Sequence, residues 1–355
     1  MDTPGDRRAF FKDLFGNVAR GALEVAPSLG GLGGLDRLAA EPEDEFDDDP
    51  FYDRPAPASP SVSAVSIVDL LRLAEEHGLA FRAPQIQELA RQSVRLTLAR
   101  PEADIPAGGS RLGGAPDLPA SIDWPTWRDE PLTFLAQLDL AVLAALGIGG
   151  ALPATGLLLF FSKTADAPSG LRTAHRGSGR VIVVEGDPAL LAASETAAGP
   201  VALGHGRAAQ LSAELTLPRL WAEPVQALEL DPDEETAWHD LRERLADLQG
   251  VELEDLSPSI NAMHRLLGYP DETRGDMPLV CELTAAGLDA GDHPYAHRRV
   301  AEFEPLSTRW RLLLQLSIDD DLEWSWGQDL DRLYFWIDDA DWQAGDMSRV
   351  WAVPE

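Results

Sequence analysis

Three short blocks of sequence occur twice along this chain of 355 residues, in the same order, and this recurrence restricts the fold more than any other feature. In each set a turn-like block is followed by two runs rich in Leu, Phe and other apolar residues. The matching blocks are residues 111–117 and 265–271, 134–140 and 312–318, and 156–161 and 331–336. One such match arises easily by chance, but three in series do not. The chain is therefore predicted to contain a duplicated unit of turn, strand and strand.

Helix signals are few and separate. Ser66 and Asp69 form a capping-box pattern ahead of a Leu-rich run, and Asp231 and Glu234 form a second one. The second helix is expected to bury Trp238, Leu241, Leu245 and Leu248. Strands that group around a few helices are typical of α+β folds. We predict an α+β fold with mainly antiparallel sheets from an internally duplicated unit, with related halves at about 93–225 and 251–355 and a few flanking helices.

The folded domain is placed at residues 66–355. Residues 1–25 have apolar side chains at helical spacing and are predicted to form an amphipathic helix, whereas residues 26–65 are rich in Gly, Pro and acids and are predicted to be a disordered linker. The helix residues expected to dock are Arg7, Arg8, Phe10, Phe11, Leu14, Phe15 and Val18. The helix packs either on its own domain or on a separate scaffold or membrane surface.

Export and membrane insertion are not favoured by the sequence. The twin arginines near the start resemble an export signal, but no uninterrupted apolar core follows them. No run of 18 apolar residues is present, so no transmembrane segment is expected. A cytoplasmic location is the expectation, with twin-arginine export as the alternative.

In both Gln-containing strand runs the apolar residues are expected to share one face of the strand and the polar residues the other. Gln137 and Asp139 alternate with Phe134, Ala136, Leu138 and Leu140, and Gln315 alternates in the same phase with Leu312, Leu314, Leu316 and Ile318. The polar side chains either face solvent, or bond a neighbouring loop, or line a polar groove across both halves. The turn residues expected to be structural are Gly114, Pro116, Asp117, Gly268 and Pro270.

At these residues the sequence resembles the YwqG-like family of bacterial proteins of unknown function. The motifs that carry the resemblance are residues 112–119, 123–125, 131–139, 156–161, 264–271, 310–316 and 332–336. The resemblance covers roughly residues 66–355, implies an α+β fold with duplicated halves, and supplies no catalytic residues. Members of the family can lie near genes for secreted toxins, which implies an immunity or interaction role. The N-terminal helix and acidic linker depart from the family pattern and indicate a specialised location.

No catalytic motif is present: the chain lacks a Gly-x-Ser-x-Gly elbow, a phosphate-binding loop, a dinucleotide fingerprint and His-Glu-x-x-His. His264 precedes a turn and is either a general base or a residue that stabilises this turn. His293 and His297 have the spacing of two metal ligands on a helix, but Pro294 lies between them. Cys281 lies in an apolar run and is expected to be an inert core thiol. No cofactor and no metal are predicted.

The formal net charge is −31, which disfavours nucleic-acid binding because the phosphate backbone attracts basic surfaces. The acids concentrate in residues 229–255, with 11 acids against two arginines, and in residues 319–346, with 10 against one. Trp324 and Trp326 lie in the second stretch and belong either to the core or to an exposed ligand-binding edge. A basic protein partner is predicted for these two acidic faces.

These observations predict a non-enzymatic module that binds a protein or peptide and is localised by its N-terminal helix. Two alternatives stay open. One is an enzyme of unknown reaction that uses the polar groove, with Gln137, Asp139, His264, Asp271 and Gln315 as its candidate residues. The other is a passenger of a scaffold or compartment that residues 1–25 target.

Overall fold

The computed structural model describes most of the chain from residue 65 onward. The described residues are 65–100, 103–148, 150, 152–188, 191, 206–251, 263–318, 322, 324 and 330–355. The predicted N-terminal helix and its docking residues, the linker as far as residue 64, and Trp326 lie outside them.

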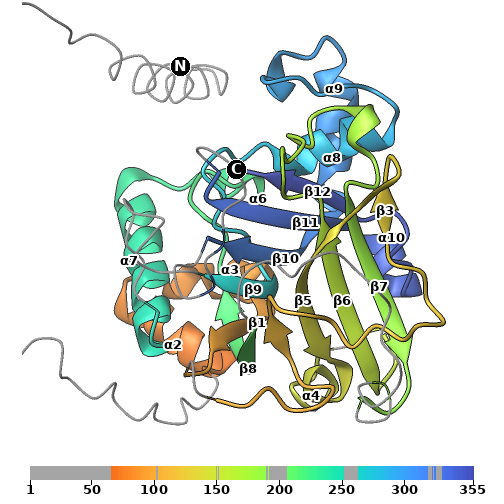
Figure 1. The fold of residues 1–355 in the computed structure, drawn as a ribbon. Helices are drawn as coiled ribbons and strands as arrows, with labels where there is room; N and C mark the ends of the chain where they lie inside the picture. The colour runs from red at the N-terminus through yellow and green to blue at the C-terminus, as the bar shows by residue number, and fades with distance from the viewer. Residues whose placement is uncertain are drawn as a thin grey trace, which may run out of the picture. The chain divides into compact units, whose positions relative to one another are not determined.

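Ten strands form one antiparallel sheet at the centre of the domain (Figure 1). They are β1 (Arg91–Leu98), β2 (Arg111–Leu112), β5 (Thr133–Asp139), β6 (Gly156–Ser162), β7 (Gly179–Glu185), β8 (Arg207–Thr216), β9 (His264–Leu267), β10 (Trp310–Ser317), β11 (Arg332–Asp338) and β12 (Trp351–Pro354). The order across the sheet is β12-β11-β10-β9-β1-β8-β2-β5-β6-β7. The predicted mixture of helices with mainly antiparallel strands is confirmed, as a single large sheet.

The sheet curves until its two edge strands meet, so that it is nearly barrel-shaped. β7 approaches β12 at Gly179, where an added Cβ would lie 2.5 Å from the Cβ of Ala352. Trp351 closes the contact, since its Nε1 donates to the carbonyl oxygen of Gly170 at 2.8 Å. Curling in this way protects edge strands that would otherwise expose unpaired backbone groups. The strands therefore bury side chains on both faces, and every residue of β6 is buried.

A bulge in each Gln-containing strand changes the alternation that the sequence predicted. The register shifts between Phe134 and Ala136 in β5 and between Leu312 and Leu314 in β10. A bulge adds one residue and reverses the facing of the residues beyond it. Phe134 and Leu312 therefore pack in different core clusters from the later apolar residues of their strands. The predicted shared face was wrong at these two positions.

One group of helices packs near β1 and β8, and its longest helix, α7 (Pro232–Leu248), lies at the left of Figure 1. It contains α2 (Ile67–Glu76), η1 (Ala80–Arg82), α3 (Ala83–Leu89), α6 (Glu223–Gln226) and α7 (Pro232–Leu248). The capping boxes predicted at Ser66 and Asp231 are both present. Trp238 is fully buried, as predicted. Leu248 is 37% exposed instead, because α7 ends there and the next residue, Gln249, bonds Leu215 of β8 with its buried side-chain amide.

A second group lies beyond the β10–β12 side and contains α8 (Met277–Ala285), η3 (Pro294–Ala296), α9 (Val300–Phe303) and η4 (Glu304–Arg309). Cys281 is fully buried in α8 among apolar side chains, as predicted. Short elements complete the described chain: β3 (Thr126–Trp127), β4 (Glu130–Pro131), α4 (Leu140–Ala145), η2 (Thr173–His175) and α10 (Asp339–Ala344). None of the helices in the described ranges has the length and apolar character needed to cross a membrane.

The close approach of β7 and β12 gives a testable prediction. Gly179→Ala should lower the free energy of unfolding by about 1–3 kcal/mol, because the new methyl group overlaps Ala352. Ala352→Gly combined with it should recover part of the loss, measured by urea denaturation. If the double variant is as unstable as the sum of the two single variants, the two strands do not approach each other in this way.

Candidate functional site

The predicted candidates Gln137 and Asp117 belong to one buried cluster with Arg111. Gln137 accepts a hydrogen bond from the Asp117 amide at 2.8 Å and donates its Nε2 to the Asp117 carboxylate at 2.7 Å. The Arg111 guanidinium binds the same carboxylate. Gln137 also donates to the Gly109 carbonyl oxygen at 3.0 Å. The glutamine thus fixes the segments before and after β2, which is one of the roles that the sequence left open for it.

Gln315, Asp271 and Arg265 form a second cluster with the same contacts. Gln315 accepts from the Asp271 amide at 2.9 Å and donates to its carboxylate at 3.3 Å, and Arg265 Nη1 binds that carboxylate at 2.6 Å. Here the guanidinium also binds Glu214 of β8 through Nε at 2.5 Å. Glu214 further accepts from Ser93 Oγ at 2.6 Å.

The charges of the second cluster stabilise one another. Burial alone would raise the pKa of Glu214, but Arg265 and Arg95 outweigh it and hold that pKa below its usual value. Asp271 behaves in the same way, because Arg265 and Arg219 offset its burial and lower its pKa. Both carboxylates are therefore ionised and satisfied in the folded domain.

Neither glutamine is accessible to a ligand, since both side chains are fully buried. Among the other candidates, His264 is 2% exposed and packs edge-on against Trp324, with ring centroids 5.9 Å apart. Trp324 is itself buried, so its ring is not part of an exposed edge. Asp139 accepts from the Ala141 amide and caps α4. The structure thus brings Asp271 and Gln315 together and places Gln137 in the other cluster.

The turn residues lie where backbone segments come close together. Gly268 has φ +77°, and a Cβ there would lie 2.6 Å from the Cβ of Ser93. Gly114 has φ +69°, and a Cβ there would lie 2.8 Å from the Cα of Gly206. A side chain at either position would both strain the backbone and displace a neighbour.

The second cluster predicts a large stability effect. Arg265→Met should destabilise the domain by about 3–5 kcal/mol, because it leaves two buried carboxylates without their shared cation. Arg111→Met removes the partner of one carboxylate only, and its side chain is 12% exposed, so it should cost less. Urea denaturation of both variants tests this, and equal losses would contradict it.

Glu272 is a buried carboxyl group that sequence analysis did not single out. It is 7% exposed, and its Oε2 has no hydrogen-bond partner within the described part of the chain. Burial raises its pKa to about 8, with further contributions from the neighbouring carboxylates of Glu355 and Asp276. Glu355 accepts from Tyr334 Oη at 3.0 Å. Glu272 is therefore protonated at neutral pH.

This raised pKa predicts how stability depends on pH. The folded domain retains a proton that the unfolded chain releases near pH 4.5, so stability should fall as pH rises from about 4.5 to about 8. Glu272→Gln should match the wild type at pH 5 and exceed its stability by at least about 1 kcal/mol at pH 8.5. Thermal unfolding at both pH values measures this. A difference between the two proteins that does not change with pH would contradict it.

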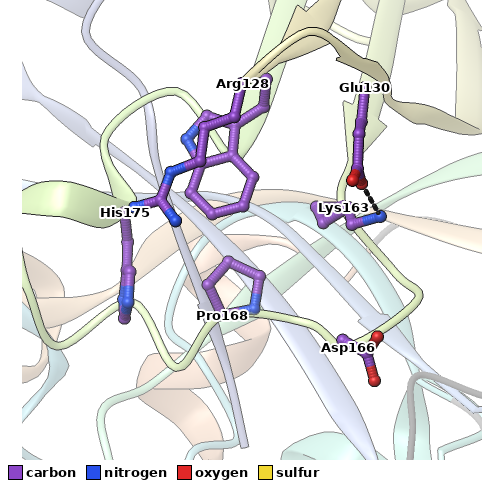
Figure 2. Close-up of a pocket in the computed structure, with 7 residues that line it drawn as sticks. Arg128, Glu130, Lys163, Asp166, Pro168 and His175 are labelled. Carbon is purple, nitrogen blue, oxygen red and sulfur yellow. Dashed lines mark hydrogen bonds and ion pairs between the residues drawn. The ribbon is translucent and has the colours of Figure 1, made fainter.

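An open pocket of about 410 Å³ lies at the β3–β4 hairpin, and no residue of either cluster lines it. Figure 2 shows the residues that do. Its wall comes from the hairpin and from the long loop between β6 and β7. The lining residues are Trp127, Arg128, Glu130, Lys163, Asp166, Pro168 and His175. This volume falls within the range of about 300–1,000 Å³ that is typical of ligand sites.

The hairpin is held rigidly. Arg128 and Asp129 have φ of +53° and +64°, as a tight two-residue hairpin turn requires. The Arg128 guanidinium stacks on the Trp127 ring with its Cζ 4.2 Å from the ring centroid, and it donates to the Ala174 carbonyl oxygen at 2.9 Å. Trp127 Nε1 donates to the Arg176 carbonyl oxygen at 3.0 Å. These bonds tie the hairpin to the loop across the pocket.

Ionic groups lie on both sides of the pocket. Lys163 Nζ binds the Glu130 carboxylate at 2.6 Å, as the dashed line in Figure 2 shows. The His175 imidazole has a buried Nδ1 without a hydrogen-bond partner among the described residues. Its pKa is lowered by partial burial and by the guanidinium groups of Arg172 and Arg128, so the ring is neutral at pH 7.

Sequence analysis did not identify this pocket. Its residues are spread from 127 to 175 and match no motif, and only the tertiary structure brings them together. The one available signal was Lys163, because the chain has only one other lysine, Lys12.

One surface group has ligand atoms spaced closely enough to hold a metal ion, within the described ranges. His239, Asp240 and Glu243 of α7 have such atoms within 4.8 Å of one another. The side chains of His239 and Glu243 are about half exposed, at 46% and 50%, and surface acids often adopt this spacing without an ion. His293 and His297 do not share a helix, since only a short 3-10 turn lies between them.

Residues 110–354 match a family model described as a domain of unknown function, DUF1963. The match covers more than half of the chain. The chain belongs to this family. A comparison with curated proteins finds no match. The DUF1963 region includes both Gln clusters and the pocket, but it begins after β1, the strand that contributes Ser93 and Arg95 to the second cluster.

Proposed function

We propose that this DUF1963 protein is a non-enzymatic binding module that takes a segment of a protein or peptide into the pocket at the β3–β4 hairpin. The observation that carries the proposal is the pocket itself, which is open, of ligand size, and walled by a hairpin fixed at both sides. Its lining combines the apolar rings of Trp127 and Pro168 with a few polar groups. Such a combination is typical of recognition sites.

The buried clusters support binding more than catalysis. A catalytic group has to reach a substrate, whereas Gln137, Gln315 and His264 are buried and Asp271 is bonded on all sides by its own domain. These residues determine the shape of the loops and leave recognition to the surface. An immunity or other interaction role would fit a module of this kind.

Several finer predictions remain proposals. We propose that the domain is YwqG-like and consists of two copies of one unit, with β12-β11-β10-β9-β1 corresponding to β7-β6-β5-β2-β8. Two observations support the duplication: the Arg–Asp–Gln contacts recur in both clusters, and the bulge recurs in β5 and β10. In addition, Gln137 is opposite Arg111 as Gln315 is opposite Arg265.

The basic partner of the acidic faces also remains a proposal. Asp233, Asp240 and Asp247 are exposed on α7, within the stretch 229–255. Five of the ten acids in the other stretch, 319–346, lie outside the described residues. So does the N-terminal helix that is proposed to localise the protein or to target it as a passenger.

His175 favours an enzyme as the second candidate function. A general base requires a neutral imidazole, and the buried Nδ1 of His175 has no hydrogen-bond partner among the described residues. The Lys163–Glu130 pair lines the same pocket and is available to orient a substrate. This candidate uses the pocket and not the buried clusters.

A peptide array probed with the purified full chain tests the binding proposal. We expect a set of related peptides to be retained by the wild type and lost with Trp127→Ala, because this change removes both the apolar wall and the platform under Arg128. Val68→Ala, on α2 at a side chain that is 71% exposed, is the matched control and should bind as the wild type does. Equal retention by the wild type and Trp127→Ala, or no retained peptide, would contradict the proposal.

A further inference from the structure

We infer that the pocket binds a carboxylate of its peptide ligand on the Lys163 ammonium, with Arg128 and His175 in the same lining. The inference rests on the proposed function, because it names the chemical class of the group that the pocket recognises. The proposed function rests on the size and walls of the pocket, and the inference adds the charged group that the pocket recognises.

The loop that forms one wall of the pocket is basic within an acidic protein, while the lining itself balances Arg128 and Lys163 against Glu130 and Asp166. Residues 163–180 contain four basic residues, Lys163, Arg172, Arg176 and Arg180, against the single acid Asp166. The chain as a whole has a net charge of −31. An anionic group is therefore repelled by most of the surface and attracted at this loop, which directs it to the pocket.

Glu130 already shows how a carboxylate fits the Lys163 ammonium. Its side chain is 64% exposed, whereas that of Lys163 is 19% exposed. An exposed carboxylate that bonds a largely covered ammonium at 2.6 Å loses little when it turns into solvent. A carboxylate of the ligand can therefore replace Glu130 on Lys163 and keep the ion pair intact.

Arg128 supplies further donors at the same pocket. One of its Nη atoms binds the Ala174 carbonyl oxygen, and its plane is fixed on the Trp127 ring. A guanidinium has five N–H donors, so this single bond leaves others for a ligand. Trp127 and Pro168 provide apolar surface for the methylene groups of an Asp or Glu side chain.

Protonation of His175 should make the affinity for a carboxylate depend on pH. The charged groups that act on it are Arg128 from the hairpin, Arg172 from its own loop and Asp289 from the segment after α8, and Lys163, Glu130 and Asp166 share its pocket. A bound carboxylate offsets the two guanidinium charges and favours the imidazolium. The affinity should therefore rise as the pH falls through the pKa of His175, down to about pH 5, where the carboxylate itself begins to take up protons.

The experiment titrates the full-length protein with N-acetylglutamate amide and with its neutral isostere, N-acetylglutamine amide. NMR signals of labelled histidine and tryptophan side chains report the binding at His175 and Trp127. We expect the carboxylate probe to bind about tenfold more tightly than the neutral probe and to tighten further from pH 8 to pH 5.5. Inorganic phosphate serves as a third probe.

Substitutions of the two ion-pair partners, Lys163 and Glu130, should have opposite effects on the affinity for the carboxylate probe. Lys163→Met should weaken binding of the carboxylate probe by about tenfold, because it removes the ammonium. Glu130→Gln should tighten it, because it removes the competing carboxylate. If both substitutions weaken binding, the pair is structural and the inference fails. Thermal unfolding of each variant shows whether it remains folded.

The remaining outcomes separate the two proposals. Equal binding of the carboxylate and neutral probes, or tighter binding of phosphate than of the carboxylate, would overturn the inference. Suppose that peptides without any acidic residue are retained by the wild type and lost with Trp127→Ala. The proposed function would then stand, and the inference that the pocket binds a carboxylate would be refuted. If the carboxylate probe binds as expected but no peptide is retained, the proposed function fails and the anion site stands.

Discussion

The Arg265 guanidinium holds together the middle of the sheet. It extends from β9 past β1 to Glu214 on β8, and it binds Asp271 in the turn that follows its own strand. A buried cation is costly unless every donor is matched, so the strands have to keep the register that places both carboxylates within reach. Gln315 adds β10 to the same arrangement through the Asp271 amide. One charged side chain thereby links β9 to β8 directly and to β10 through Asp271 and Gln315.

The burial of these polar groups also limits where a ligand can reach the protein. The polar side chains of the two clusters bond one another and are closed to solvent. The binding site that we propose therefore lies on surface segments next to the sheet. The β3–β4 hairpin and the β6–β7 loop are such segments, and the bonds from Trp127 and Arg128 to the loop make their surface stiff. Binding residues often lie on loops that a rigid scaffold positions, and the proposed site follows this arrangement.

Sequence patterns predicted the fold well where local signals were strong. The capping boxes at Ser66 and Asp231 located two helices, because the capping side chains bond backbone groups within the same turn. The strands that contain Gln137 and Gln315 were also correctly placed. Their bulges were missed, since a bulge depends on the partner strand and leaves no mark in the alternation itself. The apolar run around Cys281 was read as core, but its helix was not predicted.

The sequence by itself located long strands such as β5, β6, β10 and β11, turns that need glycine, and the strong acidity, because each of these follows from the residues and their immediate neighbours. The blocks that contain β2 and β9 were predicted only as turns. Only the tertiary structure decided that the sheet curls until β7 meets β12, and that Gln137 and Gln315 are buried supports and not a groove. It alone brought Trp127, Lys163 and His175 to one pocket. The physical reason is distance along the chain: these contacts join residues that are separated by 20 or more positions, so they form only after the chain between them has folded.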